Sequence, residues 1–126
     1  MAFGDVGGVV TELIITCKTP SSGTVSIAKG DAVKLAGPYT ITNATSEEDP
    51  VFGEALANAS TLDTAIPVKV RGICIFPYTG SAPTVDGESG VVASGTAGSV
   101  KAPLSGNGKG INVKVDTALS LVHVLL

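Results

Sequence analysis

Residues 51–76 read V-F-G-E-A-L-A-N-A-S-T-L-D-T-A-I-P-V-K-V-R-G-I-C-I-F, and their second half carries the densest β-strand signal in the chain. Within residues 66–71, apolar residues alternate with proline or charged residues, which is the two-residue period of a strand with one wet face. After Gly72 the apolar residues change parity, to Ile73 and Ile75. A one-residue phase change at a glycine is typical of a β-bulge or a barrel corner. We therefore expect one bent strand, against which the other strands are laid.

The composition is that of a small β-protein with an aliphatic core. The chain has 126 residues, 16 glycines, 7 prolines and no tryptophan, and only 4% of its residues are aromatic. Such a length suits one domain, and the many glycines and prolines indicate short strands and frequent turns. Charged residues make up only 15% of the chain. Either much of the surface meets another protein, or the molecule is compact and neutral-polar, and we favour the first reading.

These features predict an all-β fold, a small antiparallel β-barrel or sandwich with an extended N-terminal arm. We expect residues 1–24 to form the arm and its strand, and residues 25–126 to form a single barrel-like domain. The strand over Val9–Cys17 is apolar on both faces. It is interpreted equally well as an arm that adds to the sheet edge of a neighbouring subunit and as an ordinary internal strand.

Three further β-segments are expected in the body of the chain. Apolar residues on both sides of Lys29-Gly30-Asp31 predict a β-hairpin over residues 25–35, and residues 39–44 predict another short strand. The Gly/Ser-rich residues 84–110 suggest brief strands, around Val91-Val92 and Val100, separated by glycine turns.

The chain ends in a predicted hairpin over residues 111–126. Its first strand alternates apolar and polar residues, so one of its faces is polar. Its second strand is apolar on both faces, and the leucines share their face with His123. Such a strand needs cover from two directions, so it is either central in the barrel or packed by its outer face against another chain.

The sequence points to no catalytic, cofactor or metal site, and we expect the protein not to be an enzyme. Cys17 and Cys74 lie in apolar β-like runs and are interpreted as two buried thiols rather than as a disulfide. The only histidine, His123, fits a core or interface position better than a general base. The acidic run at 46–50 lacks the spacing of a calcium loop and is expected to be a solvated loop.

The charge pattern argues against two classes of partner. The net charge is −3, and the lysines and arginines are scattered, whereas nucleic-acid binding requires concentrated positive charge. No apolar run approaches the roughly 20 residues that span a bilayer. We therefore expect neither nucleic acid nor a membrane as partner.

Four segments occur in an order that resembles the small capsid decoration, or cement, proteins of tailed bacteriophages. They are K-G-D-A-V-K-L (29–35), V-F-G-E-A-L-A-N-A (51–59), I-P-V-K-V-R-G-I (66–73) and G-I-N-V-K-V-D-T-A-L-S-L-V-H-V-L-L (110–126). In that family a "GD-V" hairpin, a "GxAL" strand, a "V-V-G" strand and a C-terminal "KVD…V-LL" hairpin recur in this order. The resemblance covers about residues 27–126. Residues 84–110 depart from it because they lack a clear second "GD-V" turn, and the N-terminal arm has no match.

The resemblance implies a structural virion protein that binds the outside of the phage head and clamps neighbouring copies of the major capsid protein. It implies self-association, with a trimer favoured and a dimer as the alternative. The protein would lie on the capsid exterior, and in the host cytoplasm during assembly. The residues expected at its interfaces are Val9, Val10, Leu13, Ile15, Leu121, His123 and Leu125.

Two other functions remain open at this stage. One is a receptor- or glycan-binding β-module, for which Tyr39, Tyr78 and Phe76 are the only sources of an aromatic pocket. The other is a structural subunit of the phage tail or baseplate. No cofactor or metal is expected for any of these functions.

Overall fold

The structure is a computed structural model that describes residues 12–86 and 89–126. Every regular element within these residues is a β-strand, so the all-β prediction is confirmed. The strands are β1 (Leu13–Lys18), β2 (Ala32–Gly37), β3 (Thr40–Thr42), β4 (Gly53–Ala55), β5 (Ala65–Arg71), β6 (Ile73–Pro77), β7 (Val92–Ala93), β8 (Val100–Lys101), β9 (Ile111–Asp116) and β10 (Leu121–Leu125). The predicted strand residues Val9 and Val10 lie outside the described residues.

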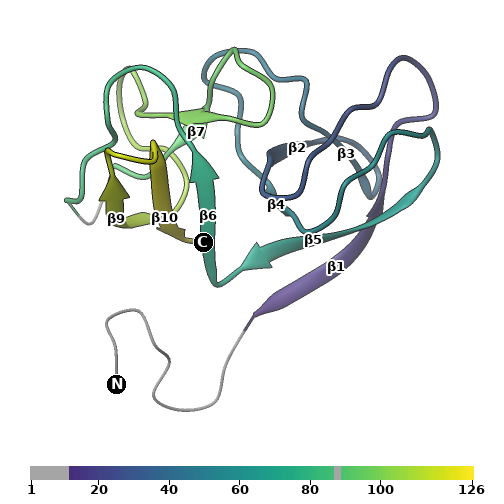
Figure 1. Ribbon diagram of the computed structural model, residues 1–126, viewed down its shortest axis with the longest axis horizontal. Coiled ribbons are helices and arrows are strands. Elements are labelled where there is room, and N and C mark those ends of the chain that lie inside the picture. Colours follow the sequence, from purple (N-terminus) through teal and green to yellow (C-terminus); the bar gives the residue numbers. More distant parts are fainter. Residues whose placement is uncertain (1–11, 87–88) are drawn as a thin grey trace.

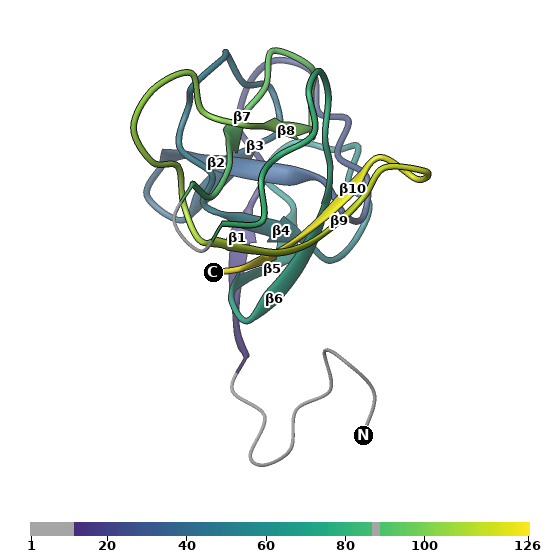
Figure 2. The same ribbon diagram turned by 90° about the vertical axis from the view of Figure 1, so that its left-hand side faces the viewer.

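The strands form a barrel and a second, smaller sheet beside it (Figure 1). The barrel closes in the order β1-β3-β2-β4-β5, and all its pairs are antiparallel except β1 with β3. The second sheet has the order β6-β10-β9, and β7 and β8 form a short separate ribbon. Figure 2 shows β6, β9 and β10 running side by side across one side of the molecule. The barrel and the three-stranded sheet are joined directly by the turn from β5 into β6.

Gly72 forms that turn, at the position where the sequence predicted a β-bulge or a barrel corner. Its φ of +108° lies in a region that residues with a Cβ rarely adopt, which is why a glycine stands there. The predicted change of parity is wrong. Cys74 and Phe76 are fully buried, whereas Ile75 is exposed. The chain turns without inserting a residue, so the even-numbered positions that face the barrel core continue into the core under β6.

A β-bulge does occur next to this corner, in the ladder between β1 and β5. Leu13 pairs with Arg71 while Ile14 pairs with Lys69, so Val70 has no partner in β1. Such a bulge increases the local twist of the ladder where β5 leaves the barrel. The irregularity therefore precedes the glycine instead of following it.

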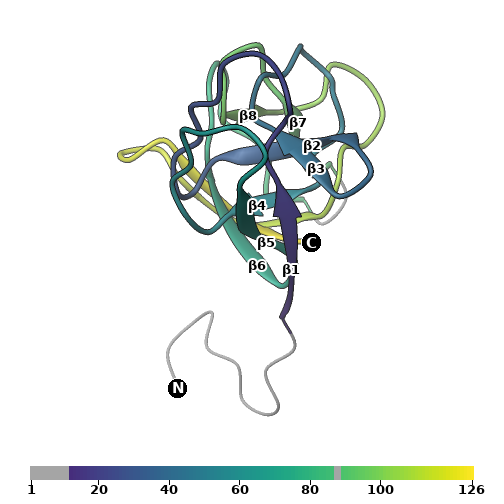
Figure 3. The same cartoon turned by 90° about the vertical axis from the view of Figure 1, so that its right-hand side faces the viewer.

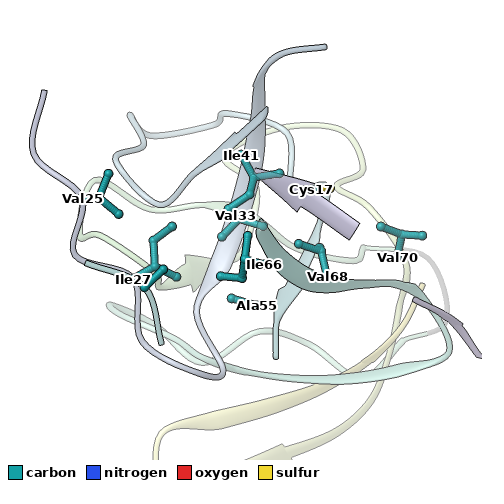
Figure 4. Close-up of a cluster of buried hydrophobic side chains, with 10 residues drawn as sticks. Cys17, Val25, Ile27, Val33, Ile41, Ala55, Ile66, Val68 and Val70 are labelled. Carbon is teal, nitrogen blue, oxygen red and sulfur yellow. The ribbon is translucent and has the colours of Figure 1, made fainter. Parts of the chain in front are cut away.

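Each sheet covers its own hydrophobic core. The barrel interior holds ten buried residues, and Figure 4 shows side chains from its strands pointing toward one another. They are Cys17, Val25, Ile27, Val33, Ile41, Ala55, Ala59, Ile66, Val68 and Val70. The second core lies under β6 and β10 and also has ten buried residues. They are Ala32, Val51, Cys74, Phe76, Tyr78, Val91, Ala93, Val100, Val122 and Val124.

The predicted hairpin over residues 25–35 is wrong. Its two halves do not pair with each other, because the whole segment runs antiparallel to residues 53–59. Ile27 bridges Ala59, the amide of Gly30 donates to the Ala55 carbonyl, and β2 begins by pairing with β4. The polar turn at Gly30 is therefore a bend along a neighbouring strand and not the tip of a hairpin.

The other predicted strands are present. The strand expected in residues 39–44 is β3, which forms a hairpin with β2. The brief strands expected in residues 84–110 are β7 and β8. The C-terminal hairpin is formed by β9 and β10.

The positive φ of Gly72 makes the role of this glycine at the corner testable. Gly72→Ala should lower the free energy of unfolding by about 1–3 kcal/mol, because a Cβ strains the backbone at this φ. Gly95→Ala is the matched control, since Gly95 has no positive φ and only ordinary contacts around a new Cβ. Urea unfolding of both variants measures the difference, and equal stabilities would show that the corner does not depend on glycine.

Candidate protein-interaction site

The three-stranded sheet covers the second core with one face and leaves its other face open. The strand registers align three cross-strand rows on that open face. These rows are Ile73–Leu125–Ile111, Ile75–His123–Lys114 and Pro77–Leu121–Asp116. We call these nine residues the outer sheet face.

The outer sheet face is largely apolar. Ile75, Leu125 and Ile111 keep 40–41% of their surface exposed, and Val113 beside them keeps 46%. Val113 is the bulged residue of β9, left without a partner by the register shift between His123 and Val124. The charged residues of the outer sheet face, Lys114 and Asp116, both lie on the edge strand β9. Contiguous exposed apolar surface with a polar margin is typical of a protein interaction site.

Three of the expected interface residues lie together on this face. Leu121, His123 and Leu125 alternate along β10, with His123 half-buried between Ile75 of β6 and Lys114 of β9. The opposite face of β10 is fully buried through Val122 and Val124. The reading that placed this strand centrally in the barrel is wrong, because β10 is the central strand of the separate three-stranded sheet. Its outer face has no cover within the described residues.

Three further exposed residues of the same surface, Ile75, Ile111 and Val113, were not predicted. The pattern of β9 misleads because its polar residue Asn112 faces the core, where it is only 1% exposed. The Asn112 side-chain amide donates to the carbonyls of Thr84 and Gly90, both at 3.0 Å. This amide ties Thr84 and Gly90 to the sheet. With Asn112 facing the core, Ile111 and Val113 are left exposed on the outer side.

Two further expected interface residues, Leu13 and Ile15, belong to β1. Leu13 and Ile14, at its beginning, are about half exposed, and Ile15 is half-buried against the barrel core. Figure 3 shows β1 along the outside of the barrel, with its beginning at the lower end of the coloured ribbon. Val9 and Val10 lie outside the described residues. Because β1 belongs to the barrel and not to the three-stranded sheet, it forms a surface separate from the outer sheet face.

A second apolar feature lies between β1 and the β2–β3 turn. Six residues from β1, β2, the β2–β3 turn and the segment before β4 line a hollow of about 300 Å³. They are Ile15, Leu35, Gly37, Pro38, Tyr39 and Phe52. We call this hollow the barrel-mouth groove.

The three aromatic residues considered for a ligand pocket do not come together. Phe76 and Tyr78 are buried in the second core, whereas Tyr39 is 71% exposed on the rim of the barrel-mouth groove. Tyr39 has a φ of +50°, and its carbonyl accepts a hydrogen bond from the amide of Lys18. Among the described residues, Tyr39 is the one aromatic side chain that is largely exposed and could stack on a planar ligand.

The acidic loop at 46–50 is fixed by lysines from two strands. The Asp49 carboxylate lies 2.7 Å from Lys34 Nζ, and this hydrogen bond, with one from the Ser46 amide, lowers the pKa of Asp49. The Glu48 carboxylate accepts hydrogen bonds from the Leu104 amide and from Lys101 Nζ, which lower the pKa of Glu48. The loop thus ties β2 to β8, and the expectation that it is merely solvated is incomplete.

Buried ionisable groups gather at the Gly72 corner. Cys74 is buried, and this burial, followed by the nearby charge of Glu54, raises its pKa to about 12. Burial also raises the pKa of Glu54, whose Oε1 accepts a hydrogen bond from the Ile75 amide. Cys17 lies in the other core, so the two thiols are free and buried, as predicted, and do not form a disulfide. A thiol with so high a pKa is a poor nucleophile.

The described residues contain no group of three or more His, Cys, Asp or Glu that could hold a metal ion. They also contain no helix of the length and apolarity that crossing a bilayer requires. No known family model matches the chain, and no curated protein sequence matches it.

The lowered pKa of Asp49 predicts a pH-dependent contribution to stability. The ion pair with Lys34 stabilises the fold above the ordinary carboxyl pKa of 3.8, and this contribution is lost as the pH falls through the lower pKa of the folded state. Asp49→Asn should therefore be less stable than the wild type at pH 7, with the difference shrinking below pH 3.8. Urea midpoints measure it, and the neighbouring Glu47→Gln, outside these ion pairs, is the control.

The burial of both cysteines predicts that neither thiol reacts in the folded protein. At pH 8 an aromatic disulfide reagent should modify fewer than about one thiol in ten within an hour, and both thiols at once in denaturant. Absorbance of the released thiolate follows the reaction. Rapid modification of the folded protein would contradict the burial of Cys17 in the barrel core or of Cys74 in the second core.

Proposed function

We propose that the protein is a capsid decoration protein, which binds the outer surface of a phage head and stabilises the expanded shell. The observation that carries the proposal is the outer sheet face, an apolar surface in a chain with few charges. The order of the four sequence segments that resemble the decoration family supports the same assignment. The partner would be the major capsid protein, contacted across the boundary between neighbouring copies.

The apolar character of the outer sheet face explains how binding would stabilise a shell. A protein that binds the expanded shell and not the free subunit stabilises that state by mass action. Each contact removes apolar surface from water, at roughly 25 cal/mol per Å². Repetition over many equivalent sites on a shell turns modest single contacts into a large total stabilisation.

Head binding is tested by placing charge on the outer sheet face. The double variant Ile75→Asp/Leu125→Asp should weaken binding to expanded heads, built from the major capsid protein of the same genome, by about 30-fold or more. Both side chains are partly exposed, so the free protein should keep its fold. Co-sedimentation with heads over a range of protein concentrations measures the affinity.

Leu104→Asp is the matched control, because Leu104 is also an exposed apolar residue but lies in the loop after β8, away from the outer sheet face. It should bind heads as the wild type does. Unchanged affinity of the double variant would remove the outer sheet face from the head contact. Failure of the wild type to bind heads at all would overturn the proposed function.

The exposed ring of Tyr39 favours one alternative function, that of a receptor- or glycan-binding module. Aromatic rings at the rim of an apolar hollow are suited to stacking against a flat ligand face. A glycan array probed with the wild type and with Tyr39→Ala distinguishes the two functions. Glycan binding that depends on Tyr39 would favour the module over the decoration protein. A tail or baseplate subunit remains a further alternative, which binding to isolated tails would reveal.

A further inference from the structure

The edge of β1 that faces away from β5 offers unused backbone groups. In an antiparallel ladder, alternate residues direct both their N–H and C=O groups toward the partner strand. The Thr19 amide donates to the Thr64 carbonyl on the β5 side, and the Lys18 amide donates to the Tyr39 carbonyl on the β3 side. This alternation directs the backbone groups of Ile14 and Thr16 toward the β3 side.

No described strand lies beside Ile14 and Thr16 on that side. The pairing of β1 with β3 consists of one residue pair, Lys18 with Thr40. Because these two strands are parallel, β3 continues past the end of β1 and not back along it. The barrel is therefore closed at Lys18 and open along the first part of β1.

The barrel-mouth groove lies beside this open edge. Ile15 forms part of its lining, and Leu35, Tyr39 and Phe52 line it from the other side. An open strand edge next to an apolar groove is the arrangement by which proteins bind an extended segment as an added strand. The edge supplies backbone hydrogen bonds, and the groove accepts alternate side chains.

Positive charge lies at the end of the groove near Phe52. Lys109 Nζ lies 5.8 Å from the centre of the Phe52 ring and donates to the Phe52 carbonyl at 3.3 Å. Arg71 is close enough that its charge, after burial, lowers the pKa of Lys109. No described carboxylate forms an ion pair with Arg71 or Lys109. A segment that suits the groove would carry apolar residues and an acid.

We propose that the barrel-mouth groove and the open edge of β1 bind residues 1–11 of a second copy of this chain as an added β-strand. Those residues read M-A-F-G-D-V-G-G-V-V-T, with mostly apolar side chains and a single charged side chain, that of Asp5. Asp5 complements the positive charges of Arg71 and Lys109. The proposal deepens the self-association that the resemblance to the decoration proteins implies, and it can be tested on the free protein without capsids.

The length and position of this segment favour a second copy over the chain's own groove. Eleven extended residues span at most about 36–40 Å, which is about the width of a domain of this size. The only two-residue turn of suitable chemistry in the segment is Gly7-Gly8. A hairpin around it would pair Val6 with Val9 and Met1 with Ile14. It would end before Ile15 and leave the groove empty.

Self-association of the full chain is the first test. The molar mass from light scattering should rise with concentration above the monomer value. Leu35→Asp should weaken this association by about 30-fold or more, because it places a charge in the groove wall. Leu35 is 50% exposed, and Leu104→Asp, at a residue 79% exposed, is the control that should associate normally. A wild type that stays monomeric up to about 1 mM would overturn the proposal, as would equal association of both variants.

A backbone variant tests the open edge even where Leu35→Asp lowers stability. Thr16→Pro removes the amide directed away from β5, a place where an edge strand tolerates proline. It should weaken association, whereas Thr16→Val, which keeps the amide, should not. Equal association of these two variants would show that β1 does not pair with a further strand.

Cross-linking identifies the occupant of the groove. Chains carrying Val6→Cys and chains carrying Leu35→Cys, with different masses, are mixed under mild oxidation, and mass spectrometry reads the products. A mixed disulfide between the two chains is expected, and none with Leu104→Cys as the acceptor. A single chain carrying both cysteines would close an internal disulfide if the segment filled its own groove. An internal disulfide without mixed product, or no disulfide, would overturn the proposal.

Head binding by the variants separates this proposal from the proposed function. Leu35→Asp disrupts self-association, whereas Ile75→Asp/Leu125→Asp changes the surface proposed for the head. Association lost through the first and head affinity lost through the second would place the two contacts on different surfaces. Self-association through the groove in a protein that binds no heads would leave this proposal standing and remove the proposed function.

Discussion

The turn at Gly72 is the constraint on which both halves of the molecule depend. Here one ribbon leaves the barrel as β5 and enters the second sheet as β6, and two side chains hold the backbone beyond the turn. Lys69 Nζ donates to the Ile73 carbonyl at 3.1 Å, and Glu54 Oε1 accepts from the Ile75 amide at 3.3 Å. Since Lys69 and Glu54 come from barrel strands, these bonds fix the direction of β6 relative to the barrel.

That direction determines which surfaces the chain leaves uncovered. The sheet of β6, β10 and β9 packs its inner face on the second core, where Phe76 and Val122 are fully buried. The barrel already has its own core, so no described element is left to cover the opposite face of the sheet. Because the barrel and the three-stranded sheet each cover a separate core, the outer face of the three-stranded sheet stays exposed. Both cores are mainly aliphatic, and Phe76 is the one aromatic residue among the described residues that is fully buried.

The sequence allowed the fold class and the Gly72 corner to be predicted, because periodicity and glycine position act locally. It misassigned the pairing of residues 27–33, since their partner at 53–59 is chosen by long-range backbone contacts that no local pattern specifies. It also misjudged β9, where the buried Asn112 donates two hydrogen bonds from Nδ2 to the Thr84 and Gly90 carbonyls. Leu121, His123 and Leu125 of β10 lie together on the open face of the sheet, as the two apolar faces of this strand suggest, and their role at an interface stays a prediction. Ile75 and Ile111 join that face only through the strand registers.

The single residue pair that closes the barrel has a mechanical consequence. Lys18 and Thr40 are the only Cα partners between β1 and β3. Along the rest of its length, β1 is paired with β5 alone. Leu13 is at one end of that ladder, so a force that pulls Leu13 away from β5 breaks the hydrogen bonds of the ladder one after another. The beginning of the chain can thus yield under strain while the second core, with Phe76 at its centre, stays intact.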